Sequence, residues 1–304
     1  MSAGKLEWGL RGVIIPLITP FKADLTIDWE GLDTLVEYSI DAMGCDGIVP
    51  CGTTGESPTL THAEHAEVIA RVTKQVAGRV PVIAGTGSNS TQEAIELTRA
   101  AAAVGVDATL QVCPYYNKPT QDGIFKHFAA ISEAVDLPMI LYNIPGRASR
   151  NIEPATIVRL WREVPQVVGL KDASGDLHQA MEVLRSTDRE TFQVYSGEDI
   201  MTFALLCHGS AGAIAAVAHV VGRETAAMCR AVWGGELEEA RRLHFLTMPL
   251  VDALFVEPNP IPVKQALEWL GLPAGPLRPP LGRMSEEGQV VLRAAMRAGG
   301  WLAG

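Results

Sequence analysis

Short apolar runs alternate with longer amphipathic stretches along the chain, with a repeat of about 25–30 residues. The runs are rich in Val, Ile and Leu and show little alternation between polar and apolar positions, which is typical of parallel strands buried on both faces. Eight strands are predicted, over residues 12–19, 47–53, 81–86, 108–115, 138–144, 167–172, 192–197 and 212–218.

The stretches between these strands carry signals for the N-termini of helices. Residues 61–64 and 90–93 each run from a hydroxyl residue to Glu, which fits a capping box in which side chain and backbone satisfy each other. Asp176 is placed to cap the helix after the sixth strand, and Pro154 suits the first turn of a helix. The amphipathic stretches are therefore predicted to be helices.

Eight strand–helix units in succession predict a (β/α)8 TIM barrel over residues 1–235. A doubly wound open sheet is the structural alternative. Such a sheet commonly carries a glycine-rich dinucleotide loop, and the best partial match, residues 85–90, lacks the third glycine. The barrel is thus the favoured architecture, and no dinucleotide site is expected.

The pattern changes after residue 235. Leucines continue a helical stripe until residues 257–260 break it, and two more helical segments are expected near 262–270 and 285–298. Residues 236–304 are therefore predicted to form a helical appendage without strands.

Composition narrows the possible functions. The 304 residues carry a formal net charge of −10 without a clustered basic patch, which argues against a nucleic-acid or acidic-membrane partner. The five cysteines are scattered and form no Cys-x-x-Cys pair, as expected in a reducing compartment. Residues 1–8 lack the apolar core of a signal peptide, and no stretch has the length of a membrane span. A cytoplasmic protein is expected.

The predicted strand 167–172 ends in a lysine. Lys171 follows apolar residues and precedes a turn, so its side chain is expected to lose much of its hydration. Burial favours the neutral amine, which is a nucleophile towards carbonyl compounds and forms Schiff bases. A lone lysine in such a position could equally extend its ammonium group into water. The rest of the chain decides between these two interpretations.

Other strand ends also carry reactive groups. In a (β/α)8 barrel the active site lies at the C-terminal ends of the strands. Hydroxyl, phenol and guanidinium groups follow the predicted second, fourth and fifth strands, in residues 51–57, 113–117 and 141–147. Each has a structural explanation by itself, as a turn residue, a core ring or a surface arginine. Their concentration on one predicted rim with Lys171 favours an active site.

Metal and pyridoxal phosphate mechanisms lack their usual residues. Only His219 falls near a strand end, while His62 and His65 lie in the first turn of a predicted helix. Glycines in residues 209–212 precede the eighth strand, so they belong to the face opposite a phosphate cradle. No metal or cofactor is predicted, which leaves a lysine mechanism.

Four motifs and one C-terminal segment resemble a known family. They are Gly-Thr-Thr-Gly-Glu-Ser (52–57), Pro-Tyr-Tyr-Asn (114–117), Tyr-Asn-Ile-Pro-Gly-Arg (142–147), Gly-Leu-Lys-Asp-Ala-Ser-Gly (169–175) and Phe-Val-Glu-Pro-Asn-Pro-Ile-Pro-Val-Lys (255–264). In this order and spacing they resemble the dihydrodipicolinate synthase family of Schiff-base pyruvate lyases, over nearly the whole chain.

The resemblance implies a condensation of pyruvate with aspartate 4-semialdehyde in the diaminopimelate route to lysine, by a homotetrameric lyase. Lys171 would form the Schiff base with pyruvate, and the resulting enamine would attack the aldehyde. Tyr142 would shuttle protons. Thr53 would link Tyr142 to Tyr116, which would reach into the site of a neighbouring subunit.

Substrate-binding and effector residues are implied in the same way. Thr54 would hold the pyruvate carboxylate and Arg147 the carboxylate of the semialdehyde. Gly197 and Ile214 would be further substrate-binding positions. The family's feedback site for lysine would comprise Ser57, His62, His65, Asn89, Glu93 and Tyr115.

The chain departs from the family pattern at three positions. Ala215 and His219 replace a hydroxyl and an amide residue near the site, and Asp172 stands where Glu is common. These departures leave the pyruvate half of the reaction in place and concern the second substrate.

Two alternatives remain. One is another pyruvate aldolase, such as a sialic acid lyase or a keto-deoxy-sugar-acid aldolase. Sialic acid lyases usually carry Gly-Ser-Thr-Gly-Glu in the second loop and lack an arginine at the position of Arg147. The other alternative is a non-catalytic barrel that senses keto acids, which would be expected to lose Lys171 or Tyr142. Both of these residues are present.

Overall fold

The computed structural model describes residues 8–303. Within this range the chain forms eight strands, and each is followed by at least one helix. The predicted (β/α)8 TIM-barrel class with a C-terminal helical part is confirmed. The signal-peptide prediction concerned residues 1–8, of which residues 1–7 lie outside the described residues.

All eight predicted strands are present, and most are shorter than predicted. The strands are β1 (Gly12–Pro16), β2 (Gly47–Val49), β3 (Ile83–Gly85), β4 (Ala108–Val112), β5 (Met139–Asn143), β6 (Val167–Asp172), β7 (Gln193–Ser196) and β8 (Gly212–Ile214). The missing residues lie mainly at the C-terminal ends of the strands, where the backbone leaves the hydrogen-bonding pattern of the sheet. Cys51, for example, has a φ of 56°, in the left-handed region that ends an extended strand.

Twelve α-helices lie in the described range. They are α1 (Trp29–Glu37), α2 (His62–Val76), α3 (Thr91–Ala103), α4 (Gln121–Ala134), α5 (Pro145–Ala148), α6 (Pro154–Glu163), α7 (Leu177–Ser186), α8 (Thr202–Cys207), α9 (Ala218–Trp233), α10 (Leu237–Leu254), α11 (Ile261–Trp269) and α12 (Glu286–Ala298). A π-helix covers Tyr38–Ala42, and short 3-10 helices cover Ser57–Thr59 and Asp199–Met201. None of the described helices is long and apolar enough to cross a membrane.

The contacts within the chain define two compact units. The first unit consists, among the described residues, of 8–12 and 81–214, and the second of 13–80 and 215–303. The predicted boundary at residue 235 remains a prediction.

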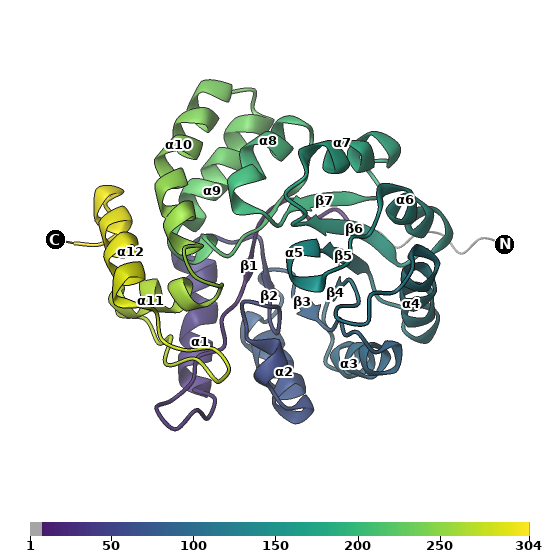
Figure 1. Ribbon diagram of the computed structural model, residues 1–304, viewed down its shortest axis with the longest axis horizontal. Coiled ribbons are helices and arrows are strands. Elements are labelled where there is room, and N and C mark those ends of the chain that lie inside the picture. Colours follow the sequence, from purple (N-terminus) through teal and green to yellow (C-terminus); the bar gives the residue numbers. More distant parts are fainter. Residues whose placement is uncertain (1–7, 304) are drawn as a thin grey trace. The chain divides into compact units, whose positions relative to one another are not determined.

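In the first unit, parallel neighbours pair in sequence from β3 through β8. Helices α3, α4, α6 and α7 follow their strands in turn (Figure 1). A buried core joins sheet and helices, with Phe128 on α4, Ile157 on α6, Val183 on α7 and Leu170 on β6. This packing fixes the register of β5, β6 and β7, whose C-terminal ends carry predicted site residues.

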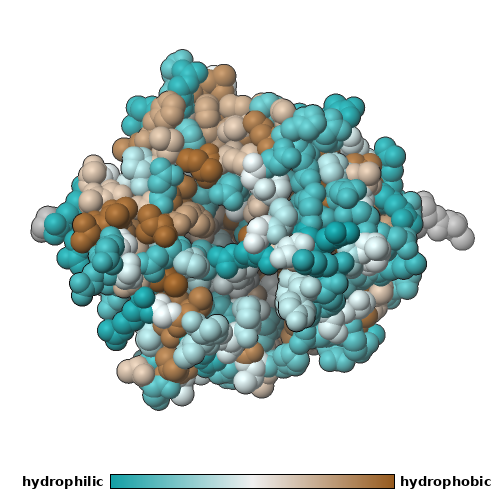
Figure 2. Space-filling model, viewed as in Figure 1, coloured by the Kyte–Doolittle hydropathy of each residue, from teal (hydrophilic) through white to brown (hydrophobic). Residues whose placement is uncertain are grey.

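In the second unit, β1 pairs in parallel with β2. The final helices form a group in which α10 packs against α9 and α12. The predicted segments near 262–270 and 285–298 are α11 and α12, and no strand occurs after β8 in the described residues. Hydrophobic residues reach the surface over these helices (Figure 2). The exposed hydrophobic side chains of the group include Phe245 of α10 and Val290 of α12.

The predicted helix starts are largely confirmed. Thr61 and Glu64 form the full capping box of α2, Asp176 caps α7, and Pro154 occupies the first turn of α6. Only one of the two hydrogen bonds of the second predicted capping box is present. The Ser90 hydroxyl accepts from the amide of Glu93, but the Glu93 carboxylate bonds the hydroxyl of Ser88 instead of returning to the Ser90 amide. A nearby hydroxyl, Ser88, therefore competes for the carboxylate.

Candidate active site

Lys171 lies at the buried end of β6, in the first unit. Its side chain belongs to a strand in which every residue is buried, and only 7% of the residue is exposed. The ammonium nitrogen lies 4.4 Å from the centroid of the Tyr142 ring. The predicted burial of this lysine is confirmed, and an extended side chain with its nitrogen in water is not what the structure shows.

Strand register brings Tyr142 and Lys171 together. They are direct partners in the parallel pair of β5 and β6, and Lys171 is in turn paired with Tyr195 of β7. Side chains at matched positions of neighbouring parallel strands point to the same face. The amine and the phenol ring are therefore adjacent because the two strands pair without offset at this point.

Gly197 shapes the space that the Lys171 side chain occupies. A Cβ atom added at Gly197 would lie 2.7 Å from Cγ and 2.8 Å from Cε of Lys171. The Gly197 amide also donates a hydrogen bond of 2.6 Å to the carbonyl of Asp172. Only glycine leaves room for the lysine stem at this approach. The structure thus gives Gly197 a packing role, while its predicted substrate contact stays a prediction.

Two carboxyl groups near Lys171 have raised pKa values. Burial raises the pKa of Glu198, and the positive charge of Lys171 partly opposes this shift. Burial also raises the pKa of Asp172, opposed by hydrogen bonds from Ser174 to its Oδ1. Glu198 was not among the predicted site residues, although it lies two residues after β7, where the strand-end rule that identified the other candidates also applies.

Arg147 lies on the short helix α5, directly after β5. The residue is exposed, and α5 spans only Pro145–Ala148. The fully buried Asn143 fixes the loop that follows this helix. Its amide group donates 2.8 Å to Asn151 Oδ1, and its Oδ1 accepts 2.9 Å from the Ile152 amide. Asn143 is therefore a positioning residue, whereas the sequence alone shows only that it belongs to the motif of residues 142–147.

The two tyrosines after β4 face outward. Tyr116 is 87% exposed and has a φ of 69°, an uncommon conformation for a residue with a side chain. Tyr115 is 37% exposed. The next residue, Asn117, ties the loop down through a 2.8 Å bond to the carbonyl of Asn89. The phenol of Tyr116 is therefore presented away from its own unit by a fixed loop.

The threonine motif lies after β2, in the second unit. Thr53 is half-buried and Thr54 is 3% exposed. The Thr54 hydroxyl accepts a 2.8 Å hydrogen bond from the side-chain amide of Asn259. The carbonyl of Gly55 accepts a 2.7 Å bond from the Thr19 hydroxyl, beyond the end of β1. The loop is thus held at Thr54 itself and at the residue that follows it.

A buried ion pair holds the same loop two residues further on. Lys264 Nζ and Glu56 Oε1 are 2.5 Å apart, and both side chains are almost completely buried. Burial lowers the pKa of Lys264 to about 8, against the opposing effect of Glu56. The 2.5 Å contact is the geometry of an ion pair. Desolvated pairs of this kind depend on both partners being present.

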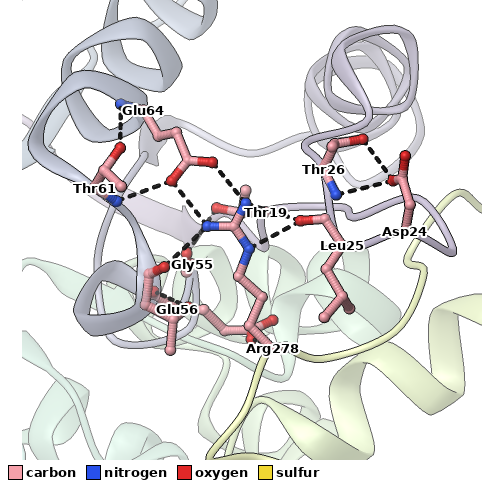
Figure 3. A network of polar contacts seen from close by, with 10 residues as sticks. Thr19, Asp24, Leu25, Thr26, Gly55, Glu56, Thr61, Glu64 and Arg278 are labelled. Atoms are coloured by element: carbon pink, nitrogen blue, oxygen red, sulfur yellow. Dashed lines mark hydrogen bonds and ion pairs between the residues drawn. The ribbon is translucent and has the colours of Figure 1, made fainter.

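Arg278 connects the loop to its surroundings. Its backbone amide donates 3.0 Å to Glu56 Oε2. Figure 3 shows its guanidinium group between the carboxylate of Glu64 and the carbonyl of Leu25, with contacts of 2.6 and 2.9 Å through Nη2. This pairing holds the pKa of the Glu64 carboxyl at about 2. The sequence by itself assigns no role to Lys264 or Arg278, because their carboxylate partners Glu56 and Glu64 lie more than 200 residues away in the chain.

His219 is a structural residue. Its ring is fully buried and bonded through both nitrogens, since Nε2 accepts from the Ile18 amide at 3.3 Å and Nδ1 donates to the Ala216 carbonyl at 2.9 Å. Burial lowers its pKa to about 4, so the imidazole is neutral at neutral pH. Within residues 8–303, no group of three or more His, Cys, Asp or Glu side chains could hold a metal ion.

The predicted lysine-site residues are divided between the two units. Ser57, His62 and the buried His65 lie in the second unit. The others, Asn89, Glu93 and Tyr115, lie in the first unit. Ile214 is the last residue of β8 and is buried. The predicted roles of all these residues remain predictions.

The fold and the lysine define a class of protein. A buried amine beside a phenol ring at the C-terminal end of a strand in a (β/α)8 barrel is suited to imine formation with a carbonyl substrate. The family model for the dihydrodipicolinate synthetase family matches residues 9–298. The chain belongs to this family.

Individual relatives support the same assignment. The 4-hydroxy-tetrahydrodipicolinate synthase of Moorella thermoacetica is 47% identical over 98% of this chain and 100% of its own length. A lysine-bound dihydrodipicolinate synthase structure from Cyanidioschyzon merolae has a TM-score of 0.94 and 45% identity, covering 96% of this chain and 99% of the other. The pyruvate complex of the chloride-inhibited Acinetobacter baumannii enzyme has a TM-score of 0.93 and 41% identity, covering 96% and 100%.

Proposed function

We propose that this protein is a 4-hydroxy-tetrahydrodipicolinate synthase, a lyase of the diaminopimelate route to lysine that condenses pyruvate with aspartate 4-semialdehyde. The observation that carries the proposal is the buried Lys171 amine, 4.4 Å from the Tyr142 ring centroid, in a chain 47% identical to enzymes of that name. Imine formation depends on the neutral form of this amine, which is the nucleophile towards a carbonyl carbon.

The reaction begins at the Lys171 nitrogen. The amine adds to the keto carbon of pyruvate, and loss of water gives the imine. Removal of a proton from the methyl carbon gives an enamine. The enamine carbon forms a bond with the aldehyde carbon of the semialdehyde, whose oxygen then takes up a proton. The amino group of the condensed semialdehyde then attacks the imine carbon, closes the ring of the product and displaces the Lys171 amine.

Proton transfer falls to the hydroxyl groups. A phenol with an ordinary pKa near 10 is a poor base when isolated in water, so it needs a hydrogen-bonded chain. Tyr142, whose ring lies beside the Lys171 nitrogen, transfers the proton, and Thr53 and Tyr116 complete the relay. The outward presentation of Tyr116 supports a role in the site of a neighbouring subunit, in a homotetramer.

Each of the two substrates carries a carboxylate that the enzyme has to bind. The Thr54 hydroxyl and backbone amide hold the carboxylate of pyruvate, with Gly197 and Ile214 forming part of the substrate pocket. Arg147 holds the carboxylate of the semialdehyde, because its planar guanidinium group matches a carboxylate with two parallel hydrogen bonds. The enzyme acts in the cytoplasm and needs no metal or cofactor.

Lysine is proposed as a feedback inhibitor. The Cyanidioschyzon merolae relative has been solved with lysine bound, which supports an effector site in this chain as well. The residues proposed for it are Ser57, His62, His65, Asn89, Glu93 and Tyr115. Unchanged rates at millimolar lysine would remove this part of the proposal.

Borohydride trapping tests the proposal directly. Reduction in the presence of pyruvate should leave a stable adduct on the peptide that contains Lys171, and none without pyruvate. Rates with aspartate 4-semialdehyde, compared with the cleavage of sialic acid and keto-deoxy-sugar acids, then identify the second substrate. An adduct without semialdehyde turnover would overturn that substrate, and the absence of an adduct would overturn the proposed function as a whole.

A further inference from the structure

Asn259 and Thr54 form a buried polar pair within the second unit. The Asn259 amide nitrogen donates to the Thr54 hydroxyl oxygen at 2.8 Å, across 205 residues of sequence. Thr54 is 3% exposed and Asn259 8% exposed. A hydrogen bond this well shielded from water has few competitors and keeps one geometry.

The direction of this bond decides what the hydroxyl can do. A threonine hydroxyl has one proton to donate and two lone pairs with which to accept. Because Thr54 accepts from Asn259, its proton must point elsewhere. The hydroxyl is therefore preset as a donor, which is the state that a carboxylate ligand requires, since a carboxylate only accepts.

The helix that follows Asn259 anchors this residue against the loop of Thr54. Asn259 lies two residues before α11, and Lys264 of the same helix forms the 2.5 Å ion pair with Glu56. One segment therefore contacts the loop at Thr54 and again two residues later. The Arg278 amide binds the other oxygen of Glu56 at 3.0 Å, so the carboxylate is held from two directions.

We propose that Asn259 is a positioning residue that orients the Thr54 hydroxyl as a hydrogen-bond donor to the carboxylate of the keto-acid substrate. This inference rests on the proposed function, in which Thr54 binds that carboxylate. Asn259 itself acts through Thr54 and takes no part in the chemistry at Lys171. Its loss should weaken pyruvate binding and leave the chemical steps close to normal.

A double-mutant cycle tests the inference through the pyruvate concentration that half-saturates borohydride trapping at Lys171. Asn259→Ala should raise this concentration about 10–150-fold, the range expected for losing one hydrogen bond to a charged group. The limiting extent of trapping and kcat should stay within about two-fold. In a Thr54→Val background, Asn259→Ala should add less than about two-fold, because residues acting through one group are not additive.

Two further variants keep the result unambiguous. Asn259→Asp, of nearly the same shape, should reverse the hydrogen bond so that Thr54 donates to the new carboxylate, and should raise the half-saturating concentration at least as much as alanine. Thr225→Val is the matched control. It removes another buried hydroxyl of the second unit, which donates 2.8 Å to the Val221 carbonyl, and should lower stability without changing pyruvate binding.

The possible outcomes distinguish a failure of the proposed function from a failure of the role proposed for Asn259. No trapped adduct in the unmodified protein would overturn the proposed function and this inference with it. A normal adduct with unchanged half-saturation in both Asn259 variants would overturn the inference alone. Additive effects of Asn259→Ala and Thr54→Val would also overturn it, because they would mean that Asn259 acts by holding the backbone rather than by orienting the hydroxyl.

Discussion

The Lys171 strand end and the Thr54 loop reach their geometry by different physical means. Lys171 is placed by strand register and apolar packing, with Tyr142 on one neighbouring strand and Gly197 directly after the other. Thr54 is placed by directional polar contacts with residues of the C-terminal part, Asn259 above all. Apolar packing tolerates modest changes of side chain, whereas a hydrogen bond or ion pair requires both of its partners.

Substitutions in the first region should therefore lower the rate of the chemical steps without lowering stability, whereas substitutions in the second region should weaken substrate binding or lower stability. Single substitutions in each region test this contrast. The largest effects are expected where a reacting group is removed, and the smallest where only the shape of the site changes.

Lys171→Ala should give the largest effect. It removes the nucleophile, so borohydride should leave no pyruvate adduct, and the rate should fall about 10⁴-fold or more. The free energy of unfolding should be unchanged or higher, because a buried amine is removed from an apolar strand end. Mass spectrometry and urea denaturation measure the two quantities, and a destabilised protein would contradict the contrast drawn above.

Tyr142→Phe should lower turnover about 10²–10⁴-fold, the usual contribution of a positioned acid–base group. The ring remains in place beside Lys171, so stability should change little and the imine with pyruvate should still form. Steady-state rates and trapping on the same preparation provide the comparison. Near-normal turnover would remove Tyr142 from the proton relay.

In the second region, either Glu56→Gln or Lys264→Met should destabilise the protein by about 3–5 kcal/mol, because each leaves one buried charge without its partner. The double variant should recover most of that loss, since no unpaired charge remains. Urea denaturation of the four proteins measures the coupling. Equal destabilisation by the single and double variants would show that the pair is not coupled.

Acid should weaken the second unit through His219. Its folded pKa of about 4 is below the unfolded value of about 6.5, so the unfolded state binds more protons between these values. Stability should therefore fall as the pH drops from about 6.5 to 4, by up to about 3 kcal/mol for this residue. Denaturation curves at several pH values measure the effect.

His219→Gln should flatten that pH dependence. Burial also lowers the pKa of His127 in the first unit to about 4, so part of the dependence should remain in the variant. Glu64 adds a smaller dependence at the acid end of this range, because with a folded pKa of about 2 its carboxyl takes up a proton only in the unfolded state as the pH falls through about 4.5. A variant with an unchanged pH profile would show that His219 is not buried as a neutral ring.

Gly197→Ala should give the smallest effect on activity, about 10-fold. The added methyl group would meet the Lys171 stem and displace the amine by a fraction of an ångström, without removing any reacting group. Trapping should still occur, but more slowly at saturating pyruvate. Gly146→Ala is a matched control, since a methyl group there meets no atom within 4 Å.

Much of the first region could be predicted from the sequence. The apolar run that leads into Lys171 predicted its burial, and the strand pattern predicted that Tyr142 would end a strand on the same rim. Strand ends were placed less well, because the residues after Pro16 or Val49 keep an apolar composition while the backbone turns away. The second capping box failed for a similar reason, since Ser88 offers Glu93 another partner.

By itself, the sequence determined the strand–helix alternation, the buried lysine and the family to which the chain belongs. These depend on local periodicity and on motifs read in order. Only the tertiary structure decided that Asn259, Lys264 and Arg278 hold the loop of Thr54, and that His219 bonds to the backbone. Such contacts join groups about 200 residues apart, and a directional polar bond between them exists only after the fold has fixed distance and orientation.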